Sequence, residues 1–219
     1  MNNPWRHLPK TPPHILSEDF EALTKCGENP KHLGLQLEIL PVPYLGNIEK
    51  ASVVLLCLNP GYHKSLDRKA YKDKYCFRES LNSLTFSNEI PFLCLDQKLK
   101  YTGGYKWWTR LLKRLMEEFG MKTLSEKLMC LQYLPYHSKT YCNPPCILPS
   151  QKFTFSLLKK AIEDKKTIVI MRSKKLWFKA VPELKTYPFI ELKNYRMPYF
   201  TERNTKNGDF QRIIEALRS

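Results

Sequence analysis

The sequence has no run of apolar residues long enough to cross a membrane, which argues against a membrane protein. The segment Met1–Pro13 is polar and rich in proline, so it lacks the apolar core of a secretory signal. The seven cysteines are spread along the chain and odd in number, a pattern typical of reduced thiols. Together these features predict a cytoplasmic protein without a membrane partner.

Glycine-rich nucleotide motifs are also missing, because neither the three-glycine dinucleotide fingerprint nor a P-loop occurs. Cys142 and Cys146 stand close together in Cys-Asn-Pro-Pro-Cys, and His137 lies just upstream. No second cysteine or histidine pair follows at metal-ligand spacing, and the four-cysteine pattern of an iron–sulfur cluster is absent. We therefore expect neither a metal ion nor a cofactor.

Acidic residues are few relative to basic ones. The chain has 36 lysines and arginines against 21 aspartates and glutamates, which gives a formal charge of +15. Such a folded protein repels itself, so a polyanion such as nucleic acid is its natural partner. The alternative is a solvated basic surface that serves solubility. The 42% hydrophobic fraction over 219 residues is enough for one domain with a full core.

Four apolar runs are separated by helical patterns. Residues 51–58, 128–134, 167–171 and 187–192 are predicted strands, whereas 107–119, a segment starting at Ser150, 174–180 and 208–217 have helical periodicity or caps. Strands separated by helices favour a parallel sheet. We predict a single-domain α/β three-layer sandwich, residues 44–219, with a central four-stranded parallel sheet flanked by helices.

Two further segments accompany this domain. Residues 1–43 are expected to form a loop-rich extension that packs on the domain and contains one helix near Ser17. Residues 62–104 make too long a loop for a compact domain unless they are functional or contain short helices.

The functional residues are expected at the carboxyl ends of the strands, where parallel sheets bind their ligands. There the sequence places Asn59-Pro60-Gly61-Tyr62, then Gln132 through Ser138, then Arg172-Ser173-Lys174, and after the fourth run Asn194 through Asn207. Proline fixes a turn and glycine lets a ligand approach the backbone, although for the first segment taken alone a plain strand-to-loop turn is the more common explanation.

The run Leu56-Cys57-Leu58-Asn59-Pro60-Gly61 resembles the first motif of the uracil-DNA glycosylase superfamily. It is most similar to the branches with asparagine in this motif, the single-strand-selective and mismatch-specific enzymes. Gln132 matches the position of the family's base-recognition asparagine. The segment 200–208 resembles an Arg-Asn loop, followed by a helix start, of the single-strand-selective branch. The family histidine is absent, and Tyr199 or Arg196 stands nearest to its place.

The resemblance implies roles for these residues. Asn59 would hold the attacking water, although an amide cannot take its proton. His137 is our first choice for stabilising the departing base anion, ahead of Arg172 and Tyr199, and its alternative is a structural loop histidine. Gln132 would bind the base edge, unless it bonds to backbone. Gly61, Tyr62 and Phe77 would complete the base pocket, with Phe77 equally suited to the core.

The same resemblance implies a set of DNA contacts. Arg203 would enter the gap left by a flipped nucleotide. The other expected contacts come from the loops around it and from the third strand end, namely Arg172, Ser173, Lys174, Asn204 and Lys206.

The resulting hypothesis is a monofunctional DNA glycosylase, an enzyme that flips out a damaged or modified pyrimidine and hydrolyses its N-glycosidic bond, leaving an abasic site. Its role would be excision of deaminated bases or defence against phages with modified cytosine, such as glucosylated hydroxymethylcytosine. One alternative is a non-catalytic nucleic-acid-binding module on the same fold. Another alternative is a hydrolase of free nucleosides, which the basic charge disfavours because a small substrate needs no broad basic surface.

For the oligomeric state, we favour a monomer.

Overall fold

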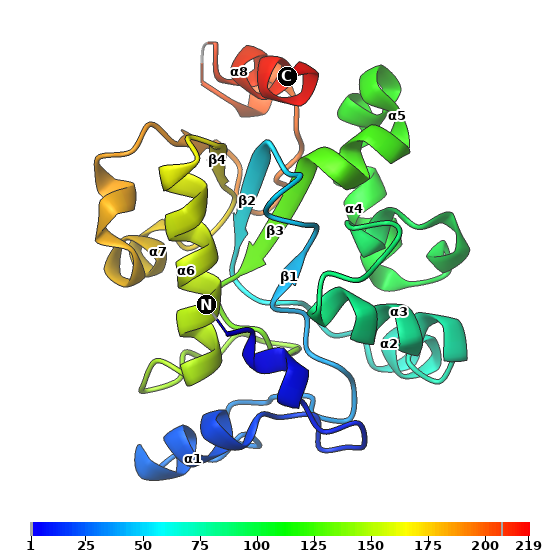
Figure 1. Cartoon of the computed structure of the whole chain (residues 1–219), viewed down its shortest axis with the longest axis vertical. Helices are drawn as coiled ribbons and strands as arrows, with labels where there is room; N and C mark the ends of the chain where they lie inside the picture. The colour runs from blue at the N-terminus through cyan, green and yellow to red at the C-terminus, as the bar shows by residue number, and fades with distance from the viewer. Residues whose placement is uncertain (1, 207) are drawn as a thin grey trace.

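The computed structural model describes residues 2–206 and 208–219 as an α/β fold around a mixed five-stranded sheet (Figure 1). The strands are β1 (Tyr44–Leu45), β2 (Val53–Cys57), β3 (Leu128–Gln132), β4 (Thr167–Ile170) and β5 (Ile190–Glu191), in the spatial order β1-β3-β2-β4-β5. The contiguous strands β3, β2, β4 and β5 are parallel, whereas β1 pairs antiparallel with β3. The expected four-stranded parallel sheet is thus extended by an edge strand that the sequence analysis missed.

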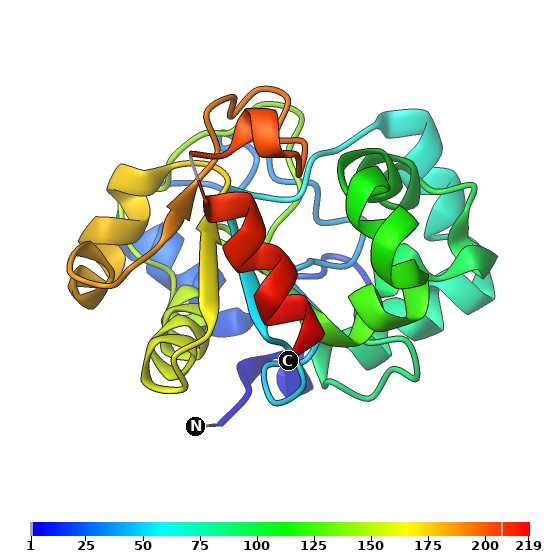
Figure 2. The same ribbon diagram turned by 90° about the horizontal axis from the view of Figure 1, so that it is seen from above.

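The helices cover both faces of the sheet. They are α1 (Ser17–Lys25), α2 (Lys64–Ala70), α3 (Lys74–Leu84), α4 (Gly103–Leu111), α5 (Lys113–Lys127), α6 (Pro149–Glu163), α7 (Lys174–Ala180) and α8 (Asp209–Arg218). Five short 3-10 turns join them: Pro4–His7, Leu93–Leu95, Gln97–Leu99, Pro182–Lys185 and Glu202–Asn204. Figure 2 shows α4 and α5 on the opposite side of the sheet from α6 and α7.

Alternate residues of each central strand enter opposite cores, as the pleat of a strand requires. Along β2, Val54 and Leu56 pack in one core with α6 and Trp177 of α7. Val53 and Leu55 pack in the other core with α4, α5 and α8. Both faces of β2 are therefore buried, which explains why its sequence is an unbroken apolar run.

Two elements differ clearly from their predicted bounds. The helix predicted over 107–119 is interrupted at Leu112, which separates α4 from α5, and α5 continues past the predicted end across a kink at Gly120, whose φ of 74° is left-handed. The strand predicted over 187–192 is reduced to β5. The long segment 62–104 contains α2, α3 and two 3-10 turns, in agreement with the expectation of short helices.

The N-terminal segment shares the core of the sheet. Trp5, Leu16, Leu23 and Leu40 are buried in the same core as β2 and α6. Removal of residues 1–43 would therefore expose part of that core.

A buried carboxylate connects this segment to the rest of the chain. Asp19 of α1 is fully buried, and it accepts hydrogen bonds from the Tyr136 hydroxyl at 2.6 Å and from the Ser150 backbone N–H at 2.9 Å. Burial raises the pKa of Asp19 above its ordinary value, although the two hydrogen bonds act in the opposite direction. The network joins α1 to the loop after β3 and to the first turn of α6.

None of the helices in the described ranges is both long and apolar enough to span a membrane.

Candidate functional site

A cavity of about 510 Å³ opens beside the carboxyl ends of β2, β3 and β4. The loops that follow these strands meet there because the strands are parallel. Ser138 N–H donates to the Pro60 carbonyl, and Gly61 and Ser138 form a parallel bridge, so the first two loops lie side by side. The expected site residues that line the cavity are Asn59, Gly61, Tyr62, Gln132, His137 and Arg172.

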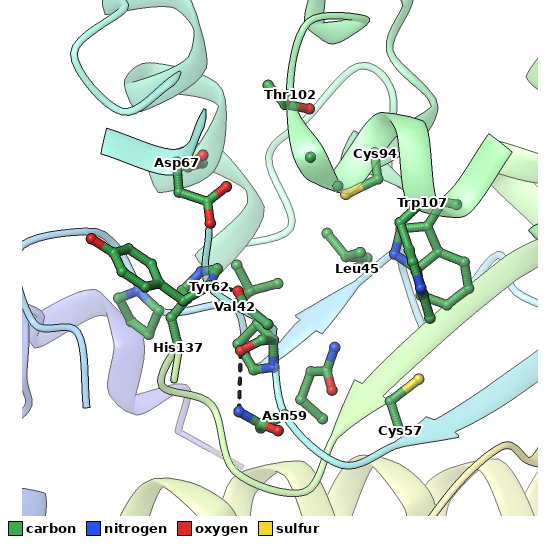
Figure 3. Close-up of a pocket in the computed structure, with 18 of the residues that line it drawn as sticks. Val42, Leu45, Cys57, Asn59, Tyr62, Asp67, Cys94, Thr102, Trp107 and His137 are labelled. Atoms are coloured by element: carbon green, nitrogen blue, oxygen red, sulfur yellow. Dashed lines mark hydrogen bonds between the residues drawn. The ribbon is translucent and has the colours of Figure 1, made fainter. Parts of the chain in front are cut away.

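Asn59 follows β2 directly, and Figure 3 shows it at the end of the cavity near Cys57. Its Nδ2 donates to the Pro60 carbonyl at 3.1 Å and to Ser138 Oγ at 2.9 Å. A carbonyl oxygen only accepts hydrogen bonds, so the Pro60 contact fixes which end of the amide is the nitrogen. Asn59 Oδ1 remains as the acceptor, the atom that could hold a water. Ser138, which sequence reasoning did not select, therefore orients Asn59.

Gln132 is the last residue of β3 and lies beside the end of β2, where its Cα is paired with that of Cys57. Its side chain is buried, with 6% of the residue exposed, and Oε1 has no hydrogen-bond partner among the described residues. The described residues therefore give no support to the alternative in which the Gln132 side chain bonds to the backbone. A buried unpaired amide oxygen costs about 1–3 kcal/mol, so Gln132 is an acceptor available to a ligand.

His137 is held by its Nδ1, which lies 2.6 Å from the Gly61 carbonyl oxygen. Because this oxygen accepts, Nδ1 carries a proton, and Nε2 of the neutral ring faces the Tyr71 hydroxyl at 3.5 Å. Burial lowers the pKa of His137 below its ordinary value. The neutral ring is therefore favoured, and Nε2 can donate to a departing anion only after protonation.

Aromatic rings form part of the cavity wall. Tyr62 lines it next to His137 (Figure 3), and Tyr71 and Trp107 contribute further rings. Phe77 does not line the cavity, and it packs instead against the core near the His14 ring, at 6.0 Å between centroids. The structure thus favours the core interpretation of Phe77. Trp107 is half-buried: it packs against the core and also lines the cavity.

Asp67 is the one acidic residue among the described residues that line the cavity. Its Oδ2 accepts the His63 backbone N–H at 2.6 Å, which caps the start of α2. Short helices are expected in residues 62–104, but the sequence pattern fixes no bounds for them, so it does not place this carboxylate. The sequence signal for this carboxylate is the spacing of His63 and Asp67, an acidic residue four positions after the residue whose N–H it accepts.

The expected DNA-binding residues are not all at the cavity. Arg172 lines it and donates from Nε to the Tyr195 carbonyl at 3.1 Å. Ser173 is the N-cap of α7, and Lys174 forms an ion pair with Glu191 at 2.7 Å. Neither is among the lining residues.

The Arg203-Asn204 segment has a structural part and an exposed part. Asn204 is buried: its Oδ1 accepts the Asn194 N–H at 2.8 Å and its Nδ2 donates to the Tyr199 carbonyl at 2.9 Å. Arg203 and Lys206 are exposed and do not line the cavity. Asn204 therefore holds the loop after β5, and the cations beside it form no ion pair within the part of the chain that the structure describes.

The loop held by Asn204 presents two apolar side chains to solvent. Tyr195 is 60% exposed and Met197 is 53% exposed. The loop is joined to the cavity rim through the bond between Arg172 and the Tyr195 carbonyl. Both lie in the segment 194–207 that was expected at the rim, but the sequence pattern singles out neither, because an exposed side chain in a loop has no periodicity.

The described residues contain no cluster of three or more potential His, Cys, Asp or Glu metal ligands. Cys142 and Cys146 are free thiols.

Comparisons with known proteins found no match: no family model, no curated protein and no solved structure matches this chain.

Proposed function

We propose that this protein is a monofunctional DNA glycosylase of the uracil-DNA glycosylase superfamily, which hydrolyses the N-glycosidic bond of a flipped-out modified pyrimidine. The observation that carries the proposal is the unpaired, buried amide of Gln132 in the same cavity as Asn59. A carboxamide that lacks a partner in the folded chain matches the donor and acceptor edge of a nucleobase. The fold and the basic charge of +15 support the same conclusion.

The proposed reaction requires few groups. Asn59 Oδ1 accepts a hydrogen bond from a water, whose oxygen bonds to C1′ of the deoxyribose as the bond from C1′ to the base breaks. The electron pair of that bond leaves with the base, and the proton lost by the water goes to solvent or to the base. Asn59 positions the water without taking its proton, so we expect a slow enzyme. Arg172 and, after protonation, His137 would stabilise the base anion.

The first test is base release from oligonucleotides that each contain uracil, hydroxymethyluracil, hydroxymethylcytosine or its glucosylated form. Abasic sites are detected by strand cleavage in alkali. We expect release from at least one substrate. Tight, salt-sensitive binding to all of them without release would favour the second candidate, a non-catalytic binding module. The neutral His137 and the missing family histidine are the observations that favour that candidate.

Replacing Gln132 with methionine separates function from folding. Methionine has a similar shape but no amide, so kcat/KM for the preferred base should fall about 100-fold. The free energy of unfolding should stay equal or rise, because a buried unpaired oxygen is removed. Single-turnover base release and urea denaturation measure the two effects. A variant that loses stability and activity together would show that Gln132 is a structural residue.

The loop after β5 gives a prediction about the DNA. A flipped nucleotide leaves a gap in a duplex, which an exposed side chain beside the cavity can fill. We expect Tyr195→Ser to slow base release from duplex DNA about tenfold and to affect single-stranded DNA much less. Phe20→Ser, at another exposed aromatic, is the matched control. Equal losses on both kinds of DNA would exclude this role for Tyr195.

A further inference from the structure

The cavity is larger than a plain pyrimidine needs. Its volume is about 510 Å³, within the range of roughly 300–1,000 Å³ typical of sites for drug-sized ligands. A pyrimidine base has about eight non-hydrogen atoms, so it fills only part of a site that suits drug-sized ligands. With the water held by Asn59 and the base edge bound by Gln132, space remains on the side away from β2.

The remaining space contains hydrogen-bonding groups. Figure 3 shows Asp67 and Thr102 on the side of the cavity away from Asn59 and Cys57. Asp67 uses Oδ2 to cap α2, and Oδ1 takes part in no hydrogen bond or ion pair with the described residues. The Thr102 hydroxyl accepts the Tyr105 N–H at 3.2 Å, so its own proton is available to an external acceptor.

The surrounding surface suits a ring with several hydroxyl groups. A free carboxylate oxygen accepts hydrogen bonds from hydroxyls, and Thr102 can donate to them. Trp107 also lines the cavity and offers an aromatic face on the side near Cys94. An acceptor, a donor and an aromatic surface together fit a polar ring better than the methyl group of thymine or the bare C5 position of uracil.

We propose that Asp67 is a specificity-determining residue that binds the hydroxyl groups of a bulky, sugar-like substituent on the base. This inference rests on the glycosylase function proposed above and names its substrate class. Asp67 contacts the substituent rather than the reacting atoms, so its removal should lower the release of the substituted base much more than the release of smaller bases. Among the modified pyrimidines to be tested, hydroxymethylcytosine with a glucose on its hydroxyl is the probe that presents such a substituent.

The test compares two substrates that differ in this substituent. Wild-type protein and the variants Asp67→Asn and Asp67→Ala are given oligonucleotides with hydroxymethylcytosine or its glucosylated form, and kcat/KM is measured for each. We expect wild-type protein to prefer the glucosylated base by tenfold or more. Asp67→Ala should lower that preference about 10- to 100-fold, the effect of losing a hydrogen bond to a charged group. Release of hydroxymethylcytosine should stay within about threefold.

The variants control for folding. Asparagine at 67 keeps an acceptor for the His63 N–H, so α2 should retain its cap, and its loss of preference should be smaller than that of alanine. Asp73→Asn, which alters the cap of the neighbouring helix α3 outside the cavity, should leave the preference unchanged. Equal release of both bases by wild-type protein, or an equal loss on both in Asp67→Ala, would overturn this inference alone. No release of any base from the wider substrate set would overturn the proposed function with it.

Discussion

Replacing Asn59 with alanine should slow base release about 100- to 1,000-fold, the range found when a group that positions a reactant is lost. The Asn59 amide is fixed by the Pro60 carbonyl and Ser138 Oγ, which leaves Oδ1 to hold the water. Alanine has no acceptor there, so the water would lose its orientation. DNA affinity should stay within a few fold, because Asn59 makes no contribution to the basic surface.

Single-turnover base release measures the rate, and titration at several salt concentrations measures the affinity. Asn143→Ala is a matched control, because Asn143 also donates from Nδ2 to the carbonyl of a following proline, Pro144, at 3.0 Å. It does not line the cavity, so its removal should leave the rate unchanged. An Asn59→Ala protein that still releases base at the wild-type rate would contradict the proposed mechanism.

The largest expected effect on stability comes from Tyr136→Phe. This change removes one of the two hydrogen bonds to the buried carboxylate of Asp19. A buried charge that loses a donor is costly, so we expect the free energy of unfolding at pH 8 to fall by about 2–4 kcal/mol. Urea denaturation of the variant and of the wild-type protein gives the difference.

The loss in Tyr136→Phe should depend on pH. In the wild-type protein, burial raises the pKa of Asp19 in the folded state above its unfolded value near 3.8. The free energy of unfolding therefore decreases as the pH rises from that unfolded pKa through the folded pKa. Removing the hydroxyl takes away a bond that lowers this pKa, so the folded pKa rises further. The difference from wild type should therefore shrink as the pH falls and Asp19 becomes protonated.

Tyr44→Phe provides the comparison for this pH dependence. Tyr44 is also buried, but its hydroxyl donates to the neutral carbonyl of Leu84 at 2.6 Å. We expect a loss of about 1 kcal/mol that does not change between pH 8 and pH 4. If the loss in Tyr136→Phe were equally independent of pH, Asp19 would not be the charged group that we infer.

The sequence was sufficient for the central strands and for the residues at their ends. The run at 53–57 is apolar at every position because β2 is covered on both faces, and Asn59-Pro60-Gly61 marks where it stops. It did not reveal β1, because two residues carry too little pattern. It also predicted one helix over 107–119 where Leu112 interrupts the backbone, since apolar spacing continues across that break.

What the sequence determined by itself is the α/β class, the basic charge and the position of Asn59, Gln132 and His137 after two strands. These features follow from local periodicity and composition, which need no knowledge of distant contacts. Tertiary structure alone decided that Gln132 is unpaired, that His137 is held by the Gly61 carbonyl, that Asp67 lines the cavity and that Phe77 does not. Each of these facts depends on which segments, far apart in the chain, pack against one another.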